Sequence, residues 1–345
     1  DGGATFERAG EYPSDDGYSG DVALAATDEG DAYLVWIDYY GRPEAVSDLY
    51  AVATHDHGES WGEPVRVAEG DDELLVDRPW VAVGPDGTVH VKWMSYVYNG
   101  TYEEMWIGYT RSGDGGVTFD PPDAFDVSDL ANYDDYTYSN YALAVAADGD
   151  VLVSEQFLEY ESGNSLASSV RLGRLEGDEF DSDEIAETYY SRDLKLNAYP
   201  MAAAAPTGRV CFAYLDALER DIDLYVAVAD DGEDFDPPET FESGVGSTQA
   251  LPWIAADADG RCHLIWLDNR SGDWEVWAAT VRPDGTRSPI ERVSDASFTE
   301  DGSPEQWLGD MNSIAVGGSM RYAVWTDTRE GESAIYFSTS PIEGP

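Results

Sequence analysis

One short segment, Ser112-Gly113-Asp114-Gly115-Gly116-Val117-Thr118-Phe119, constrains the fold of this chain more than any other feature of its sequence. An aspartate carboxylate can accept hydrogen bonds from the N–H groups of its own turn, and glycine tolerates the positive φ angles that tight turns require. The terminal aromatic ring can fold back onto the sheet. The segment therefore predicts a tight turn between two antiparallel strands.

The same spacing occurs again at Thr54–Trp61 and, without the leading hydroxyl, at Val228–Phe235. A weaker copy at Gly177–Phe180 has lost the aspartate at the position that the pattern requires. This pattern resembles the Asp-box of the sialidase-like (BNR-repeat) β-propeller superfamily. The resemblance implies that the aspartates of the pattern have a structural role, and these are Asp1, Asp56, Asp114 and Asp230.

The two ends of the chain carry one further copy between them. Residues Asp1–Phe6 match Asp114–Phe119 at five of six positions, yet no strand precedes them. The missing strand is expected at Ala334–Ser340. We therefore expect Thr5–Arg8 to supply the outer strand of the last blade, which removes a sheet edge that would otherwise be exposed. A start in the middle of a turn also suggests a processed N-terminus.

Longer repeats predict the number of blades. Each unit has an inner apolar strand, a glycine turn, a second strand that usually ends at an aromatic residue, and a third strand. The second strands end at intervals of about 57 residues, at Trp36, Trp93, Ser154, Tyr214, Trp266 and Trp325. Such a period accommodates four strands with their loops. We predict an all-β chain, a single six-bladed β-propeller of four-stranded antiparallel blades over residues 1–345, with residues 1–8 completing the last blade.

The net charge of the chain indicates the salt concentration in which the protein works. With 70 acidic and 19 basic residues, the formal net charge is −51. Repulsion on this scale opposes a compact state in dilute buffer but is screened in molar salt, where the Debye length is about 3 Å. Because the acids are spread along the chain, we expect the solvated surface of a halophile's protein rather than a patch for a cationic partner. Nucleic acid is excluded as a partner, since basic surface is lacking.

The sequence constrains the cellular location of the protein less. No apolar run approaches the roughly 18 residues of a membrane span, and no signal peptide is present. The chain has two cysteines, Cys211 and Cys262, and we expect two buried thiols rather than a disulfide, although the disulfide stays an alternative. We expect an extracellular or cell-surface location, and the oligomeric state stays open.

Long, irregular loops gather on the face opposite the Asp-box turns, and tyrosines such as Tyr96 and Tyr136 are dense in them. A tyrosine ring can stack on a sugar while its hydroxyl forms hydrogen bonds, so this face is a candidate glycan platform. The alternative is that these rings brace the loops against the sheets.

Charged motifs reach the same face. Two second strands end in Trp-x-Asp-x-Arg, one with Asp268 and Arg270 and the other with Asp327 and Arg329. Arg78 precedes an inner strand. One interpretation is that the three arginines converge as a clamp for a carboxylate, which guanidinium groups fit well. The alternative is that each arginine pairs with the aspartate two residues earlier or with a neighbouring blade.

The resemblance also implies a chemistry. Sialidases bind the substrate carboxylate with three arginines, use a tyrosine nucleophile activated by a glutamate, and use an aspartate as acid and base. Here Asp77 and Asp310 are candidate acids or bases, and Tyr199 with Glu155 is the candidate couple, unless these side chains pack loops. Arg78-Pro79 is similar to the Arg-Ile-Pro element of the family but lacks its middle residue.

Cofactors are not expected. The four histidines are scattered, which argues against zinc, and Ca²⁺ is an alternative only where aspartates cluster near the axis. We expect an exported propeller that binds an acidic glycan. A further expectation is that it hydrolyses this glycan as an exo-acting glycoside hydrolase. The alternative is a non-catalytic module of a larger surface protein that binds a protein or polysaccharide partner.

Overall fold

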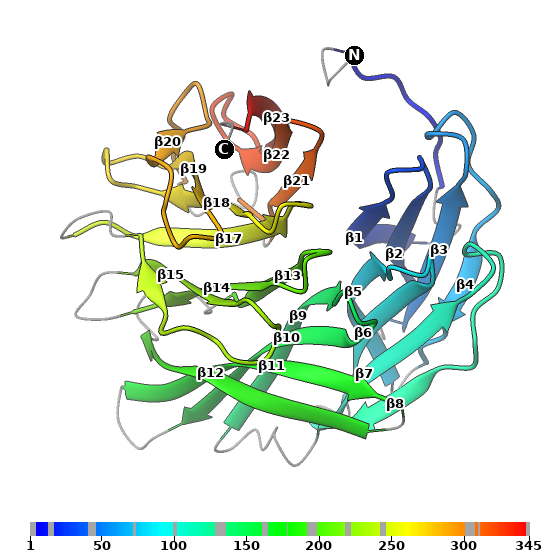
Figure 1. Ribbon diagram of the computed structural model, residues 1–345. Helices are drawn as coiled ribbons and strands as arrows, with labels where there is room; N and C mark the ends of the chain where they lie inside the picture. The colour runs from blue at the N-terminus through cyan, green and yellow to red at the C-terminus, as the bar shows by residue number, and fades with distance from the viewer. Residues whose placement is uncertain are drawn as a thin grey trace. The chain divides into compact units, whose positions relative to one another are not determined.

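Every regular element in the computed structural model is a β-strand, and no helix occurs in the part that it describes (Figure 1). The structure describes residues 5–12, 17–40, 46–71, 74–98, 102–127, 136–160, 165–177, 179–191, 199–217, 222–241, 246–300, 308–309 and 311–342. The strands form six antiparallel sheets in which neighbours along the chain are neighbours in the sheet.

The first three sheets follow one another in the sequence. The first contains β1 (Gly17–Ala26), β2 (Ala32–Tyr40), β3 (Val46–Thr54) and β4 (Val65–Ala68). The second contains β5 (Leu74–Val83), β6 (Val89–Tyr98), β7 (Tyr102–Ser112) and β8 (Asp123–Asp126). The third contains β9 (Tyr136–Val145), β10 (Val151–Tyr160), β11 (Ser165–Glu176) and β12 (Glu179–Ser191).

The last three sheets continue the pattern. The fourth contains β13 (Met201–Ala204), β14 (Val210–Asp216), β15 (Asp223–Ala229) and β16 (Glu239–Thr240). The fifth contains β17 (Gln249–Ala256), β18 (Cys262–Asp268), β19 (Glu275–Val281) and β20 (Glu291–Arg292). The sixth contains β21 (Ser313–Gly317), β22 (Met320–Asp327) and β23 (Ala334–Pro341). Six consecutive meanders confirm the six-bladed β-propeller fold that the repeat predicts.

The sixth sheet has three strands among the described residues. Thr5–Arg8, expected to add a fourth, has no strand pairing in the structure. The ring of Phe6 nevertheless packs edge-on against Phe337 of β23, with 5.0 Å between the ring centroids. Closure of the last blade by the N-terminus therefore stays a prediction.

The chain divides into two compact units, which we treat separately. The N-terminal unit comprises Glu7–Tyr160 and Leu172–Asp183, and the C-terminal unit comprises Asp1–Phe6, Glu161–Arg171 and Glu184–Pro345. In each unit, apolar side chains from facing sheets form the core. Val35, Val81 and Val91 belong to one such cluster in the N-terminal unit, and Ile265, Ile314 and Trp325 belong to one in the C-terminal unit.

Inner strands share an irregularity that matters for the site. Register shifts occur between Gly20 and Ala23 in β1, between Asp77 and Trp80 in β5, and between Ala250 and Trp253 in β17. Within these β-bulges, non-glycine residues adopt positive φ angles, and Tyr199 does so just before β13: Asp21 48°, Arg78 49°, Leu251 47° and Tyr199 43°. Bulges redirect side chains, and strained backbone of this kind concentrates at functional sites.

Two of the predicted turns have the same hydrogen-bond arrangement. Asp114 accepts bonds from the Ser112 hydroxyl at 2.8 Å and from the Thr118 N–H at 2.9 Å. Asp56 accepts the equivalent bonds from Thr54 and Ser60, both at 2.8 Å. The hydroxyl groups of Ser60 and Thr118 donate to Asp56 and Asp114 as well. These hydroxyl bonds, together with the bonds above, favour the carboxylate and lower the pKa of each aspartate to about 2.

The third turn differs. Here the N–H groups of Glu233 and Asp234 donate to Asp231, at 3.1 and 3.0 Å. Asp230, to which we had assigned that role, forms an ion pair with Arg209 at 3.0 Å. Asp1 lies outside the described residues.

The two cysteines form a disulfide, so the expectation of two buried thiols is wrong. Cys211 of β14 and Cys262 of β18 are fully buried, and their Cα atoms are 6.0 Å apart. This separation lies within the range that a disulfide spans. The bond joins the second strands of the fourth and fifth sheets.

Candidate functional site

The bulges in β1 and β5 bring two carboxyl groups of the N-terminal unit together. The carboxyl groups of Asp21 and Asp77 lie close enough to interact electrostatically. Burial is the main cause that raises the pKa of Asp21 to about 6, and the neighbouring carboxyl group of Asp77 raises it further. Because a neighbouring carboxylate disfavours a second negative charge, Asp21 retains its proton above the ordinary range of an aspartate.

Two tyrosine hydroxyls hold the carboxyl pair in place. Tyr39 of β2 donates to Asp21 at 3.0 Å, and Tyr96 of β6 donates to Asp77 at 3.3 Å. Burial raises the pKa of the Tyr39 hydroxyl, and the charges of both aspartates raise it further. Tyr39 therefore acts as a hydrogen-bond donor rather than as a base.

Arg78 brings a positive charge beside the pair. Its charge lowers the pKa of Asp21, opposing the larger effects of burial and of Asp77. The guanidinium group lies over the ring of Tyr141, 5.3 Å from the ring centroid. The backbone N–H of Arg78 donates to Asp77 at 2.8 Å, which fixes that carboxylate relative to the bulge.

A fully buried lysine lies behind the bulge. Lys92 of β6 donates to the amide oxygen of Asn140 at 2.5 Å and to the backbone carbonyl of Arg78 at 3.4 Å. Burial lowers the pKa of Lys92 well below its ordinary value, and the charge of Arg78 acts in the same direction. Lys92 thus links the second sheet to β9 and supports the backbone that carries Arg78.

Glu155 of β10 is also fully buried. Its carboxylate accepts a hydrogen bond from the hydroxyl of Ser182 on β12, the outermost strand of the same sheet. Tyr199, its predicted partner, precedes β13 at one of the positive-φ positions. The Tyr199–Glu155 couple stays a prediction, and Asp310 lies outside the described residues.

Arg270 of the C-terminal unit pairs with the aspartate two residues earlier. Its Nη2 lies 2.7 Å from Asp268 Oδ2, and its backbone N–H donates to the other carboxylate oxygen at 2.8 Å. The guanidinium group stacks on Trp277, 4.4 Å from the ring centroid. The indole of Trp266 also donates to Asp268, at 3.3 Å.

Arg329 repeats this arrangement. Its Nε donates to Asp327 at 2.8 Å, and its guanidinium group lies 4.2 Å from the ring centroid of Tyr336. It also binds Asp295, which precedes the sixth sheet. The indole of Trp325 donates to Asp327 at 3.2 Å. The pairing alternative therefore describes Arg270 and Arg329, which stabilise the ends of β18 and β22.

Sequence reasoning missed two members of the site in the N-terminal unit. Asp21 follows Gly20 in the first inner strand, at the position that corresponds to Arg78 in the second. The sequence feature that could have indicated Asp21 is a charged residue between an Asp-containing loop and an apolar run. Lys92 had a clearer signal, because it is one of only two lysines in the chain and lies in the middle of a predicted strand.

Within the described residues, no three His, Cys, Asp or Glu side chains gather closely enough to hold a metal ion. The same part of the chain contains no helix that is long and apolar enough to cross a membrane.

Comparisons with known proteins support the fold. No protein-family profile and no curated protein sequence matches the chain. A protein of unknown function from Dyadobacter fermentans is 15% identical, with a TM-score of 0.60 over 96% of this chain and 97% of that one. NanB sialidase from Streptococcus pneumoniae is 9% identical, with a TM-score of 0.57 over 96% and 70%. An α-L-arabinanase from Penicillium chrysogenum is 13% identical, with a TM-score of 0.55 over 96% of both chains.

At such identities the likeness shows the fold alone. The chain has the β-propeller fold that this sialidase and this arabinanase share. What the chain does with the fold must be argued from its own site.

Proposed function

We propose that this protein is an exported β-propeller that binds an acidic glycan at the bulged inner strands of its N-terminal unit and hydrolyses it there. The observation that carries the proposal is the Asp21–Asp77 pair beside Arg78. A carboxyl group that keeps its proton near neutral pH is what a general acid requires. Two of the similar structures are a sialidase and an arabinanase, which supports a glycan as the substrate class.

The roles within the site follow from its geometry. Asp21, with its raised pKa, acts as the acid that protonates the departing glycosidic oxygen. Arg78 binds the carboxylate of the glycan, and Tyr39 and Tyr96 orient the acid.

The disulfide supports the export of the protein. Disulfides persist in oxidising environments and are rare in most cytosolic proteins. The Cys211–Cys262 bond is fully buried and joins two sheets, so it belongs to the folded structure rather than to an exposed redox site. An extracellular or surface location fits this bond, and the net charge of −51 fits a saline medium.

Hydrolysis of fluorogenic glycosides in molar KCl tests the proposal. The panel contains a sialoside, a glucuronide and an arabinofuranoside, assayed with the wild type and with Asp21→Asn and Asp77→Asn. We expect turnover of an acidic glycoside that falls about 100-fold or more in either variant, as for loss of a general acid. Arg78→Gln should raise KM for the acidic substrate more than for the neutral one. Turnover that persists in both aspartate variants would remove the pair from the mechanism.

A non-catalytic module is the second candidate, and the pairing of Arg270 and Arg329 favours it. Both arginines are held by aspartates and aromatic rings in the C-terminal unit, so they serve the scaffold there. A module binds glycans without cleaving them. Binding of an acidic glycan that Arg78→Gln weakens, with no product formed from any glycoside in the panel, would establish this alternative.

A further inference from the structure

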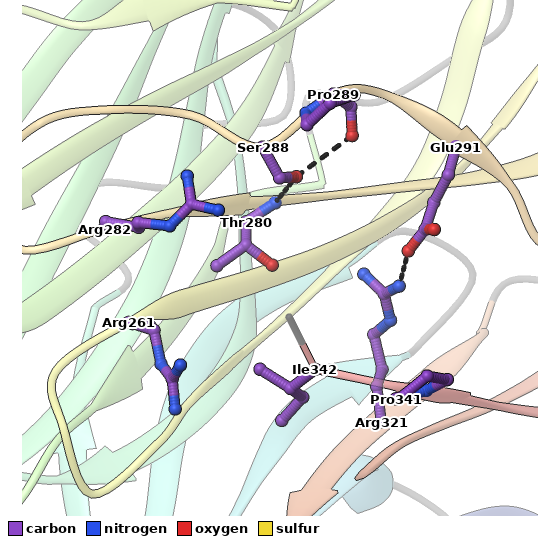
Figure 2. Close-up of a pocket in the computed structure, with 9 residues that line it drawn as sticks. All are labelled: Arg261, Thr280, Arg282, Ser288, Pro289, Glu291, Arg321, Pro341 and Ile342. Atoms are coloured by element: carbon purple, nitrogen blue, oxygen red, sulfur yellow. Dashed lines mark hydrogen bonds and ion pairs between the residues drawn. The ribbon is translucent and has the colours of Figure 1, made fainter. Parts of the chain in front are cut away.

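A small cavity in the C-terminal unit is lined by three arginines that are far apart in the sequence. Its volume is about 50 Å³. Arg261 precedes β18, Arg282 follows β19, and Arg321 lies in β22, as Figure 2 shows. The cavity lies where the second strands begin, at the opposite end of the sheets from Asp268 and Asp327. It is therefore separate from the Trp-x-Asp-x-Arg motifs.

Positive charge is concentrated in this cavity. Three of the 19 basic residues of the chain line it, and Glu291 is the only acidic residue that does so, which gives the lining a formal charge of +2. Arg261 also pairs with Asp257 at 2.7 Å and with Asp259 at 3.0 Å, and neither aspartate lines the cavity. In a chain with a net charge of −51, such a concentration requires an explanation.

Arg321 is the most buried of the three arginines. Its side chain is only 5% exposed, and burial lowers its pKa. Its Nε and Nη2 donate to the Ser340 hydroxyl at 3.1 and 2.9 Å, and Nη2 also binds Glu291. Burying a guanidinium group is costly, so a further anion would stabilise it.

The repeat supplies an internal comparison, because the N-terminal unit has a cavity in the corresponding place. The cavity of the N-terminal unit is lined by His90, three residues before Trp93. The cavity of the C-terminal unit is lined by Thr280, whose hydroxyl contacts His263, three residues before Trp266. The charged residues that line the cavity near His90 are Arg111, Asp120, Asp123 and Asp150. Their formal charge is −2, and Arg111 pairs with Asp120 at 3.2 Å.

One position shows the contrast directly. Asp150 lies four residues before Ser154, and Arg321 lies four residues before Trp325, which is the corresponding position of the last repeat. The repeat therefore accepts either sign of charge at this position. The propeller fold does not require arginine there, so the positive cavity is a property of the fifth and sixth sheets.

We propose that the cavity lined by Arg261, Arg282 and Arg321 is a binding site for a small oxyanion: a sulfate, a phosphate or a single carboxylate group. Guanidinium groups match the geometry of such anions. A volume of about 50 Å³ holds a few water-sized positions, whereas sites for drug-sized ligands measure roughly 300 Å³ or more. The cavity therefore takes one charged group rather than a whole sugar ring.

The hydroxyl groups in the cavity contribute less. Ser288 donates to the carbonyl of Pro289 at 3.0 Å and accepts from the N–H of Thr280 at 2.9 Å (Figure 2). The Thr280 hydroxyl lies 3.0 Å from a ring nitrogen of His263. Because both hydroxyls are already used, the arginines carry the binding, and the affinity depends on their charge.

Isothermal titration at constant molar KCl tests the site with three probes: sodium sulfate, sodium phosphate and sodium glucuronate. We expect one site per chain, weakened about tenfold in Arg282→Gln and unchanged in Arg111→Gln, which removes an arginine from the N-terminal cavity. Preferred binding of sulfate or phosphate would identify a free inorganic ion, and preferred glucuronate would identify a sugar-borne carboxylate. Absence of binding, or equal affinity of Arg282→Gln and the wild type, would overturn the proposal.

A second variant keeps the test decisive if Arg282→Gln disturbs the fold. Glu291→Gln removes the only acidic group of the lining, so the proposal requires tighter binding, by about tenfold. Circular dichroism of each variant serves as the control for folding. Unchanged or weaker binding in a folded Glu291→Gln variant would contradict the proposal, because electrostatic attraction in this cavity could not then drive the affinity.

Discussion

The raised pKa of Asp21 should make stability depend on pH in a way that one substitution removes. In the unfolded chain Asp21 ionises near its ordinary pKa of 3.8, and in the folded protein near 6. The folded state therefore holds the proton more tightly, and this contribution to stability is present at low pH and lost as pH rises from about 4 to 6. Above that window, the ionised pair opposes folding.

The magnitude follows from the size of the shift. Two pKa units correspond to about 3 kcal/mol, which partial exposure to solvent reduces to about 1 to 2 kcal/mol. In Asp21→Asn the amide can still donate to Asp77 but does not ionise. We expect the variant to match the wild type in unfolding free energy at pH 4 and to exceed it by about 1 to 2 kcal/mol at pH 8.

Chemical unfolding followed by tryptophan fluorescence, in molar KCl from pH 4 to pH 8, measures this difference. Glu29→Gln is the matched control, because it removes one negative charge from an exposed position. Its difference from the wild type should stay nearly constant across the range. A difference for Asp21→Asn that does not grow with pH would refute the raised pKa of Asp21, and with it the general acid in the proposed function.

Two further predictions concern the scaffold. Replacing Cys211 and Cys262 by serine opens a cross-link that spans 51 residues. The loss of this loop constraint should lower the unfolding free energy by about 4 kcal/mol. Denaturation midpoints with and without reductant measure this loss, and equal midpoints for variant and wild type would contradict it. The net charge of −51 predicts that the melting temperature rises steeply from dilute buffer to molar KCl, because salt screens the repulsion between acidic side chains. A flat response in a salt-series thermal melt would exclude the halophilic interpretation.

The sequence by itself determined the fold class. The turn around Asp114 and its copy around Asp56 depend on bonds between residues four or fewer positions apart, so they form wherever the motif occurs. Alternating apolar residues define the strands, and their spacing defines six sheets. The Trp-x-Asp-x-Arg pairing of Arg270 and Arg329 could be anticipated as an alternative for the same reason, since its partners are two residues apart.

Only the tertiary structure decided the candidate site and the disulfide. Asp21 and Asp77 are far apart in the sequence, and their contact depends on bulges in two neighbouring inner strands that no local pattern specifies. Cys211 and Cys262 come together from two different sheets, and Arg261, Arg282 and Arg321, which are far apart in the sequence, line one cavity. Local bonds are encoded by spacing along the chain, whereas these contacts depend on how whole sheets pack against one another.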